Sequence, residues 1–274
     1  MNLQLIIILM LAGILQGVLE WLPVSSEAFV FLFLIFCGVD PHLAIILAMM
    51  YHLPTGLASI LFYRREYRKI ILDVLELRFS IITRFVILSS IFTCVTAVPI
   101  FLIMDYVLAG IEEFVEKVAI VILIAIGVVM CITGFAVGSR HTAGMRSLEE
   151  ATARDCIIVG FIQGFSIIPG VSRSAVTITA LLYEGFDKKS SLDGSFILAG
   201  VASTGVFIFI IATGRLSIQY VLSVPIIMSM SFAFLISLIT MRTLLYIAGR
   251  MNYGMFLRFV GILMIIFGVP LFLI

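Results

Sequence analysis

The chain has 274 residues, of which 62% are hydrophobic and 12% are charged, and its formal net charge is +1. Its mean hydropathy is +1.26, which lies far outside the range of soluble globular domains and predicts an integral membrane protein. This small net charge argues against a nucleic-acid partner, and no basic run resembles a DNA-binding patch. We therefore expect an all-α, polytopic membrane protein whose partner is the lipid bilayer.

Six apolar stretches are close to the ~20 residues that a helix needs to cross a bilayer. In chain order they are residues 43–63, 86–104, 118–139, 196–214, 216–240 and 254–274. Two further apolar stretches are broken by a polar turn: residues 1–22 followed by 27–38, and residues 156–168 followed by 174–185. Each predicts a re-entrant helical hairpin whose turn lies deep in the protein, because irregular backbone is tolerated at membrane depth only where it lines a polar cavity.

The two broken stretches share a pattern at a constant offset of 147 residues. The offset places Gly13 on Gly160, Gln16 on Gln163, Gly17 on Gly164, Val24 on Val171 and Ser25 on Ser172. The match predicts two related halves of one membrane domain over residues 1–274, with repeat 1 at about 1–115 and repeat 2 at about 145–274. Three spans separate the hairpins, and an odd number reverses the chain, so we expect an inverted-topology repeat.

The basic residues of the loops are unevenly divided between the two sides of this topology. One side receives Arg64, Arg65, Arg68, Lys69, Arg78, Arg84, Arg140, Arg146, Arg154, Lys188, Lys189, Arg242 and Arg250, whereas the other receives Lys117 and Arg215. The positive-inside rule makes the first side cytoplasmic. We expect a multi-pass protein of the cytoplasmic membrane with both termini outside.

Ionisable residues at membrane depth are functional candidates by default, because burying their charge costs several kcal/mol. Four residues meet this condition: Glu20, Glu27, His52 and Arg173. Polar neighbours in the same segments extend the candidate site to Gln16, Ser25, Ser26, Gly170, Ser172, Ser174 and Thr177.

The turn of the second hairpin has the residues of an anion site. Ser172 and Ser174 can cap the free backbone N–H groups of the helix that follows, and the helix N-terminus attracts negative charge. The guanidinium of Arg173 suits phosphate because it donates two parallel hydrogen bonds and keeps its proton when buried. The alternative is that Arg173 pairs internally with Glu20 and locks the two hairpins together.

The first hairpin supplies a second helix start, after Ser25 and Ser26, and two such ends beside one arginine would suit a diphosphate. Gln16 and Glu20 are four residues apart and share one helical face. A carboxylate in an anion-attracting site suggests a divalent cation, since Mg2+ binds through one or two carboxylates plus substrate phosphates. Glu27 is either a second metal ligand or an acid favoured by the helix dipole. Ser26 is either a cap or a nucleophile or phosphate ligand.

His52 lies within a predicted span that Pro54 and Gly56 weaken. A buried histidine is usually a structural hydrogen-bond donor. In a broken helix, however, His52 could face the same polar cavity as Glu20, so we keep it as a candidate catalytic residue.

The two turns resemble the signature motifs of the undecaprenyl-diphosphatase family, the bacitracin-resistance membrane phosphatases. Residues 20–26 read EWLPVSS and residues 169–177 read PGVSRSAVT. The resemblance implies removal of the terminal phosphate from a polyprenyl diphosphate with a divalent cation, Mg2+ or Ca2+, which recycles the carrier lipid for cell-envelope glycan synthesis. It implies that Glu20 is the second carboxylate of the acidic motif, Ser26 the nucleophile or ligand, and Arg173 the phosphate-binding arginine, with Ser172, Ser174 and Thr177 as surrounding hydroxyls.

Two positions depart from the family pattern. Gln16 occupies the first acidic position, which the pattern permits, and Phe29 stands where bacterial members often have a histidine. If that histidine is the general acid or base, then His52, Glu27 or a metal-bound water must replace it. A transporter or flippase for the phosphorylated carrier lipid is the alternative function, because inverted repeats with broken helices are also transporter architecture. The oligomeric state is open, and a homodimer is one expected assembly.

Overall fold

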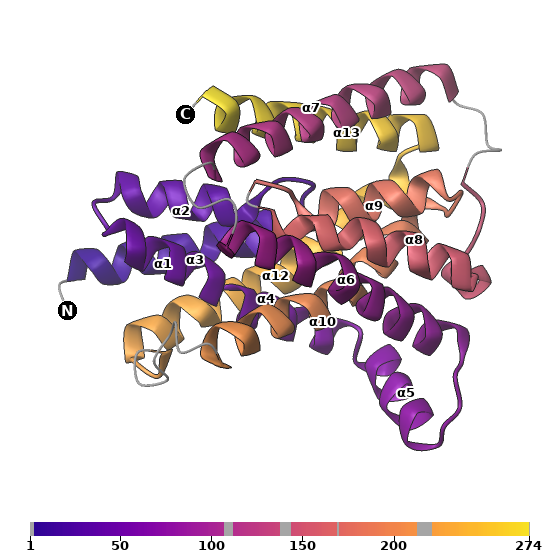
Figure 1. Cartoon of the computed structure of the whole chain (residues 1–274), viewed down its shortest axis with the longest axis horizontal. Coiled ribbons are helices and arrows are strands. Elements are labelled where there is room, and N and C mark those ends of the chain that lie inside the picture. Colours follow the sequence, from indigo (N-terminus) through magenta and orange to yellow (C-terminus); the bar gives the residue numbers. More distant parts are fainter. Residues whose placement is uncertain (1–2, 107–111, 138–143, 169, 213–220, 274) are drawn as a thin grey trace.

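A computed structural model describes residues 3–106, 112–137, 144–168, 170–212 and 221–273. Regular structure in these ranges is helical, apart from one isolated parallel bridge between Arg146 and Phe186. The predicted all-α fold is therefore confirmed. Figure 1 shows the helices packed as one bundle, with the two termini on the same side of this view.

Both predicted hairpins are present. The first consists of α1 (Leu3–Leu19) and α2 (Ser26–Phe36), and the second of α8 (Ala153–Gly164) and α9 (Arg173–Tyr183), with the short 3-10 helix η2 (Phe165–Ile167) after α8. Serine caps start the second helix of each pair: Ser25 Oγ accepts from the Ala28 N–H at 3.5 Å, and Ser172 Oγ accepts from the Ala175 N–H at 3.2 Å. In each hairpin, the turn therefore leads directly into the N-terminus of the second helix.

Five helical stretches in the described ranges are long and apolar enough to cross a membrane. They are the combined α3 (Pro41–Met50) and α4 (His52–Phe62), then α6 (Ile81–Tyr106), α10 (Lys188–Ala212), α12 (Val224–Arg250) and α13 (Tyr253–Leu273). The sixth predicted span, 118–139, coincides with α7 (Glu112–Val137), whose stretch Ile124–Phe135 is apolar. The chain is thus a polytopic membrane protein.

The bounds of two predicted spans were wrong. The span expected at 216–240 is α12, which begins at Val224 and continues to Arg250. Ser223 precedes it and Pro225 occupies its first turn, a position that favours helix initiation. The span expected at 196–214 begins earlier, at Lys188, because Asp187 accepts the Ser190 N–H at 2.9 Å and caps the helix. Residues 213–220 of both predicted spans lie outside the described residues.

The span of residues 43–62 is interrupted at Tyr51, where α3 ends and α4 begins. Pro54 explains the position, because a proline has no N–H for the carbonyl four residues earlier, here that of Met50. The helix was expected to be weak at Pro54 and Gly56, and the break lies one turn before the proline. His52 becomes the first residue of α4.

The two segments that share the sequence pattern make similar helix contacts. The offset of 147 maps Ser26–Phe36 onto Arg173–Tyr183, so α2 and α9 correspond residue by residue. Helix α1 packs on α12 and α8 on α6 at glycines: a Cβ at Gly13 would lie 2.2 Å from the Ser229 carbonyl oxygen, and one at Gly160 would lie 2.3 Å from the Ser89 carbonyl oxygen. The glycines of the shared pattern thus permit close helix contacts.

Helices α4 and α10, which are equivalent in the two repeats, run antiparallel. Gly56 lies against Ser203, Ser59 Oγ donates to the Phe196 carbonyl at 2.6 Å, and Tyr63 Oη donates to Asp193 Oδ1 at 2.7 Å. Residue numbers rise on one helix as they fall on the other, as an inverted repeat requires. The repeat boundaries near 115 and 145 stay predictions.

Two parts lie outside the central helices in Figure 1. Helices α7 and α13 pair along one side of the molecule, and the amphipathic helix α5 (Arg64–Leu75) stands apart between α4 and α6. The short 3-10 helix η1 (Leu148–Glu150) precedes α8. This arrangement places the two hairpin turns at the centre, where Trp21 has no exposed surface.

The glycine contacts predict a large difference between two alanine substitutions. Gly160→Ala would push a methyl group into the backbone of α6, and overpacking of this kind costs about 1–3 kcal/mol. Gly205→Ala is the matched control on α10, because nothing lies within 4 Å of a Cβ there. We expect a lower thermal unfolding midpoint in detergent for Gly160→Ala alone; equal midpoints would contradict the packing.

Candidate active site

Glu20 is the centre of the candidate site. Its Oε2 accepts hydrogen bonds from Gln16 Nε2 and Ser26 Oγ, each at 2.8 Å. Its Oε1 accepts from Arg173 Nη2 at 2.8 Å and from Ser203 Oγ at 3.2 Å. The residue is 4% exposed, and its partners come from α1, α2, α9 and α10. One buried carboxylate therefore connects both hairpins to α10, a predicted membrane span in the second half of the chain.

The first residues of α2 and α9 both bind this carboxylate, since Ser26 begins α2 and Arg173 begins α9. Helix N-termini carry unpaired backbone N–H groups and a partial positive charge. The predicted meeting of two helix starts is thus present, with Glu20 between them. A negatively charged ligand here would meet both helix ends.

Arg173 makes three contacts within the protein. Besides Glu20, its Nη1 donates to the Ser195 carbonyl at 3.1 Å, and its guanidinium lies 5.8 Å from the centre of the Trp21 ring. The internal pairing with Glu20 is therefore confirmed. A guanidinium has five N–H donors, so these two hydrogen bonds leave donors for a phosphate, and the phosphate-binding role stays a prediction.

His52 connects the buried carboxylate to a more exposed one. Its Nδ1 lies 3.5 Å from Glu20 Oε1, and its Nε2 lies 3.9 Å from Glu27 Oε2. The His52 side chain is 15% exposed and that of Glu27 is 48% exposed. The interruption at Tyr51 gives His52 this position, at the start of α4. The histidine thus faces the same site as Glu20, as the broken helix predicted.

The hydroxyls of the second turn bind neighbouring protein groups. Ser174 Oγ donates to the Leu22 carbonyl at 2.5 Å and lies 3.1 Å from Ser172 Oγ. Thr177 Oγ1 lies 2.6 Å from Ser195 Oγ. These bonds hold the second turn against the first and against α10. The three hydroxyls therefore position the turns, and their contact with substrate stays a prediction.

Gly170 shapes the second turn through its backbone. Its φ of +84° lies in the left-handed region that favours glycine. The residue is buried, so a side chain would be strained there. Its role in the site is conformational, and substrate binding through its N–H is untested.

The predicted metal ligands, Glu20 and Glu27, approach opposite nitrogens of His52. No group of three His, Cys, Asp or Glu residues able to hold a metal occurs in the described ranges. Gln16 offers one further ligand, because its buried Oε1 has no hydrogen-bond partner while its Nε2 donates to Glu20. A carbonyl oxygen and carboxylates fit a hard cation that takes its remaining ligands from water and phosphate.

Sequence reasoning missed three residues at this site: Ser195, Ser203 and Trp21. Ser195 accepts from Arg173 and contacts Thr177, and Ser203 donates to Glu20. A signal existed in the spacing, because Ser195 and Ser203 are eight residues apart and so share one face of an apolar span. Trp21 lies within the first motif, directly after Glu20, and its ring faces the Arg173 guanidinium.

Phe29, which stands in the family's histidine position, packs edge to face against Phe267 of α13 with ring centres 5.3 Å apart. Its side chain thus contributes to the contact between α2 and α13. Within the described part of the chain, His52 is the imidazole that lies against Glu20.

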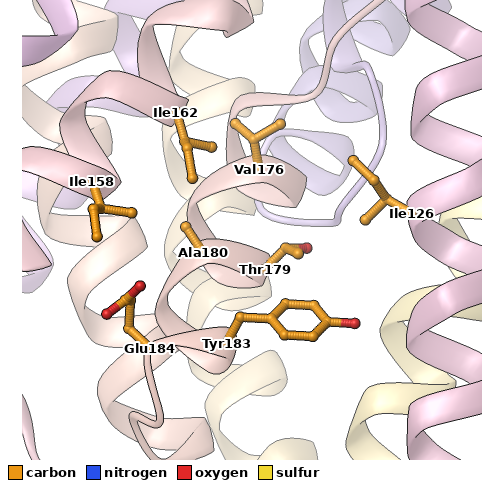
Figure 2. A pocket seen from close by; sticks show the side chains of 8 residues that line it. All are labelled: Ile126, Ile158, Ile162, Val176, Thr179, Ala180, Tyr183 and Glu184. Atoms are coloured by element: carbon orange, nitrogen blue, oxygen red, sulfur yellow. The ribbon is translucent and has the colours of Figure 1, made fainter.

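An apolar cavity of about 200 Å³ opens beside the second hairpin. Figure 2 shows isoleucines of α7 and α8 on its walls, with Val176, Ala180 and Tyr183 from α9. Val176 is one helical turn beyond Arg173, so the cavity begins close to the site along the same helix.

The sequence comparisons agree on one family. The model of the bacitracin resistance protein BacA matches residues 9–269. An undecaprenyl-diphosphatase of Methanopyrus kandleri is 32% identical over 249 residues, which is 89% of each chain. One from Methanothrix thermoacetophila is 31% identical over 253 residues, 92% of each, and one from Haloarcula marismortui is 34% identical over 201 residues, 71% of this chain and 72% of the other. With a match of this extent, the chain belongs to the bacitracin resistance protein BacA family.

Proposed function

We propose that this chain is a membrane phosphatase that hydrolyses undecaprenyl diphosphate to undecaprenyl phosphate and inorganic phosphate. Family membership and the names of its relatives support the reaction. The structural observation that carries the proposal is the Glu20 carboxylate bonded to Ser26 and Arg173 at two converging helix starts. The product would return to cell-envelope glycan synthesis as carrier lipid.

Arg173 and the backbone N–H groups at the starts of α2 and α9 would bind the diphosphate. Their charges and dipoles are fixed before substrate arrives, and such preorganised groups stabilise the negative charge that moves during phosphoryl transfer. Burial strengthens these interactions because the local dielectric constant is low. The site would therefore favour the transition state through position and electrostatics.

Ser26 is the proposed nucleophile. Its Oγ would attack the terminal phosphorus while its proton passes to Glu20 Oε2, with which it is hydrogen-bonded at 2.8 Å. The bond between the terminal phosphorus and the bridging oxygen breaks, and the lipid monophosphate leaves. Water then attacks the phosphoserine: its hydroxyl goes to phosphorus, and inorganic phosphate leaves as the Ser26 oxygen takes back the proton held by Glu20. The remaining water proton is released to solvent, which restores both the Ser26 hydroxyl and the Glu20 carboxylate.

Glu20, Glu27 and the free Oε1 of Gln16 are the residues proposed to hold a divalent cation, Mg2+ or Ca2+. When bound, such an ion neutralises phosphate charge and orients the transferred group. His52 is the residue proposed to replace the histidine absent at Phe29, because it lies against both carboxylates.

The apolar cavity in Figure 2 is a proposed seat for part of the prenyl chain. A chain attached to a diphosphate at Arg173 needs an apolar path, and α9 provides one with Val176 about one turn away and Ala180 about two turns away. Because the prenyl chain is already surrounded by hydrocarbon in the bilayer, the cavity would hold it through close van der Waals packing and not by removing it from water. This seat would favour long prenyl chains over short ones.

The transporter alternative is supported by architecture alone, namely the inverted repeat and the broken helices. The relatives that match most of this chain are named for hydrolysis, so the phosphatase is favoured. We also propose that the protein lies in the cytoplasmic membrane, with both termini outside and with the first hairpin open to the outside. A homodimeric assembly is part of the same proposal.

Phosphate release tests the proposed function directly. Purified protein should release inorganic phosphate from undecaprenyl diphosphate with Mg2+ or Ca2+, and chelation should abolish release. Arg173→Ala should lower kcat/KM by on the order of 10²–10³-fold, as loss of a donor to transition-state charge does. Arg173→Lys keeps the charge and is the matched variant, with a smaller loss. Folded wild-type protein that releases no phosphate with either metal would overturn the phosphatase.

Loss of the Ser26 hydroxyl tests the nucleophile. Ser26→Ala should abolish turnover with little effect on substrate binding, because it removes the attacking oxygen. Rapid quenching of the wild type should reveal a phosphorylated peptide that contains residue 26, and this label should be absent from the variant. Activity of Ser26→Ala within tenfold of wild type would instead make water the nucleophile.

A bulky residue in the cavity tests the seat of the prenyl chain. Ala180→Phe should lower kcat/KM for undecaprenyl diphosphate relative to isopentenyl diphosphate, whose five-carbon chain is too short to fill the cavity, by on the order of tenfold, since the cavity wall is filled. Ile132→Phe, at an exposed position of α7, is the control for added bulk. An unchanged ratio in Ala180→Phe would remove the cavity from the proposal.

A further inference from the structure

Helix α5 presents one exposed face on which basic and apolar side chains follow each other. The first turns of this face carry Arg64, Arg65, Arg68 and Lys69, all exposed. The continuation of the same surface carries Ile71, Leu72, Leu75, Leu77 and Phe79, which are 45–79% exposed. A contiguous exposed apolar patch of this kind marks an interaction surface, and the cations beside it specify the charge of the partner.

The opposite face of α5 is fixed to the bundle, so the exposed face cannot turn inward. Tyr67 Oη donates to the Ile197 carbonyl of α10, Tyr63 Oη donates to Asp193 at 2.7 Å, and Ile70 is buried. In Figure 1, α5 projects from the rest of the molecule with its ends held by α4 and α6. The basic and apolar side chains therefore keep one orientation.

The end of the segment is also held internally. Asp73 Oδ2 accepts from the hydroxyls of Ser80 and Thr83, each at 2.5 Å, and these bonds hold the pKa of Asp73 below its ordinary value. Glu76 lies 3.2 Å from Arg78 in an ion pair. Two of the three acids in the segment are thus engaged with neighbours, while the four cations of the first turns point outward.

The covalent connections place this face at a membrane surface. Helix α4 ends one membrane span at Phe62, and α6 begins the next at Ile81, so residues 63–80 lie at the boundary of the bilayer. There, apolar side chains can enter the acyl region while arginine and lysine extend their charged ends to lipid phosphates. Each lysine or arginine near an anionic lipid surface strengthens binding to that surface by about fivefold.

We propose that the exposed face of α5, formed by Arg64, Arg65, Arg68, Lys69, Ile71, Leu72 and Leu75, binds the headgroups of anionic phospholipids. The binding partner is the bilayer that the flanking spans α4 and α6 already cross. The positively charged side chains attract the anionic lipids of that bilayer. This binding is independent of the chemistry at Glu20.

Hydrogen exchange of the full-length protein in nanodiscs tests the proposal. The amides of residues 64–79 should exchange at least about fivefold more slowly in discs that contain phosphatidylglycerol than in phosphatidylcholine discs. High salt should reduce the difference, because exposed charges are screened. Equal exchange rates in the two bilayers would overturn the proposal.

Charge-neutralised variants assign the effect to this face. The triple variant Arg65→Gln, Arg68→Gln and Lys69→Gln should lose the difference between the two bilayers. The double variant Arg242→Gln and Arg250→Gln, at the end of α12, is the matched control and should keep it. Retention of the difference in the triple variant, or its equal loss in the control, would overturn the proposal. Phosphate release plays no part in this readout.

Discussion

The fold depends on the need to pair one buried carboxylate. An uncompensated charge at the depth of Glu20 would cost several kcal/mol, and the structure offsets this cost with partners from distant parts of the chain. Arg173 is 153 residues away and Ser203 is 183 residues away. To reach one carboxylate, two hairpins and a membrane span must converge, and the same convergence creates an anion site between two helix starts.

The backbone of this site is nearly symmetric, whereas its chemistry is not. The offset that maps α2 onto α9 also maps Ser26 onto Arg173, Glu27 onto Ser174 and Glu20 onto Ile167. The two halves of the chain thus supply different residues to the site. The first half supplies the carboxylates and the proposed nucleophile, and the second half supplies the arginine. Two identical turns would place like charges together, so the pairing depends on the different residues of the two turns.

Much of this arrangement was predictable from the sequence, because hydropathy, proline positions and the repeated turn are local signals. They predicted the hairpins and the meeting of their turns, and they left His52 as one of two possibilities: a structural donor or a residue that faces the cavity of Glu20. The start of α12 was not predicted, because residues 216–240 are apolar throughout and only the cap at Ser223 and Pro225 marks the boundary. Ser195 and Ser203 were missed because a hydroxyl in an apolar span has no distinctive local pattern, and its value depends on which helix packs beside it.

The distance in sequence between Glu20 and Arg173 also bears on how the protein is made. A ribosome adds about 5–20 residues per second, so the 153 residues that separate these partners take roughly 8–30 s to synthesise. During that interval the first hairpin has its carboxylate but lacks its guanidinium. Because burying a carboxylate without its cation costs several kcal/mol, we expect the first hairpin to reach its final depth only after the second half of the protein has been made. Completion of the active site and final insertion of the first hairpin would then be one late event in biogenesis.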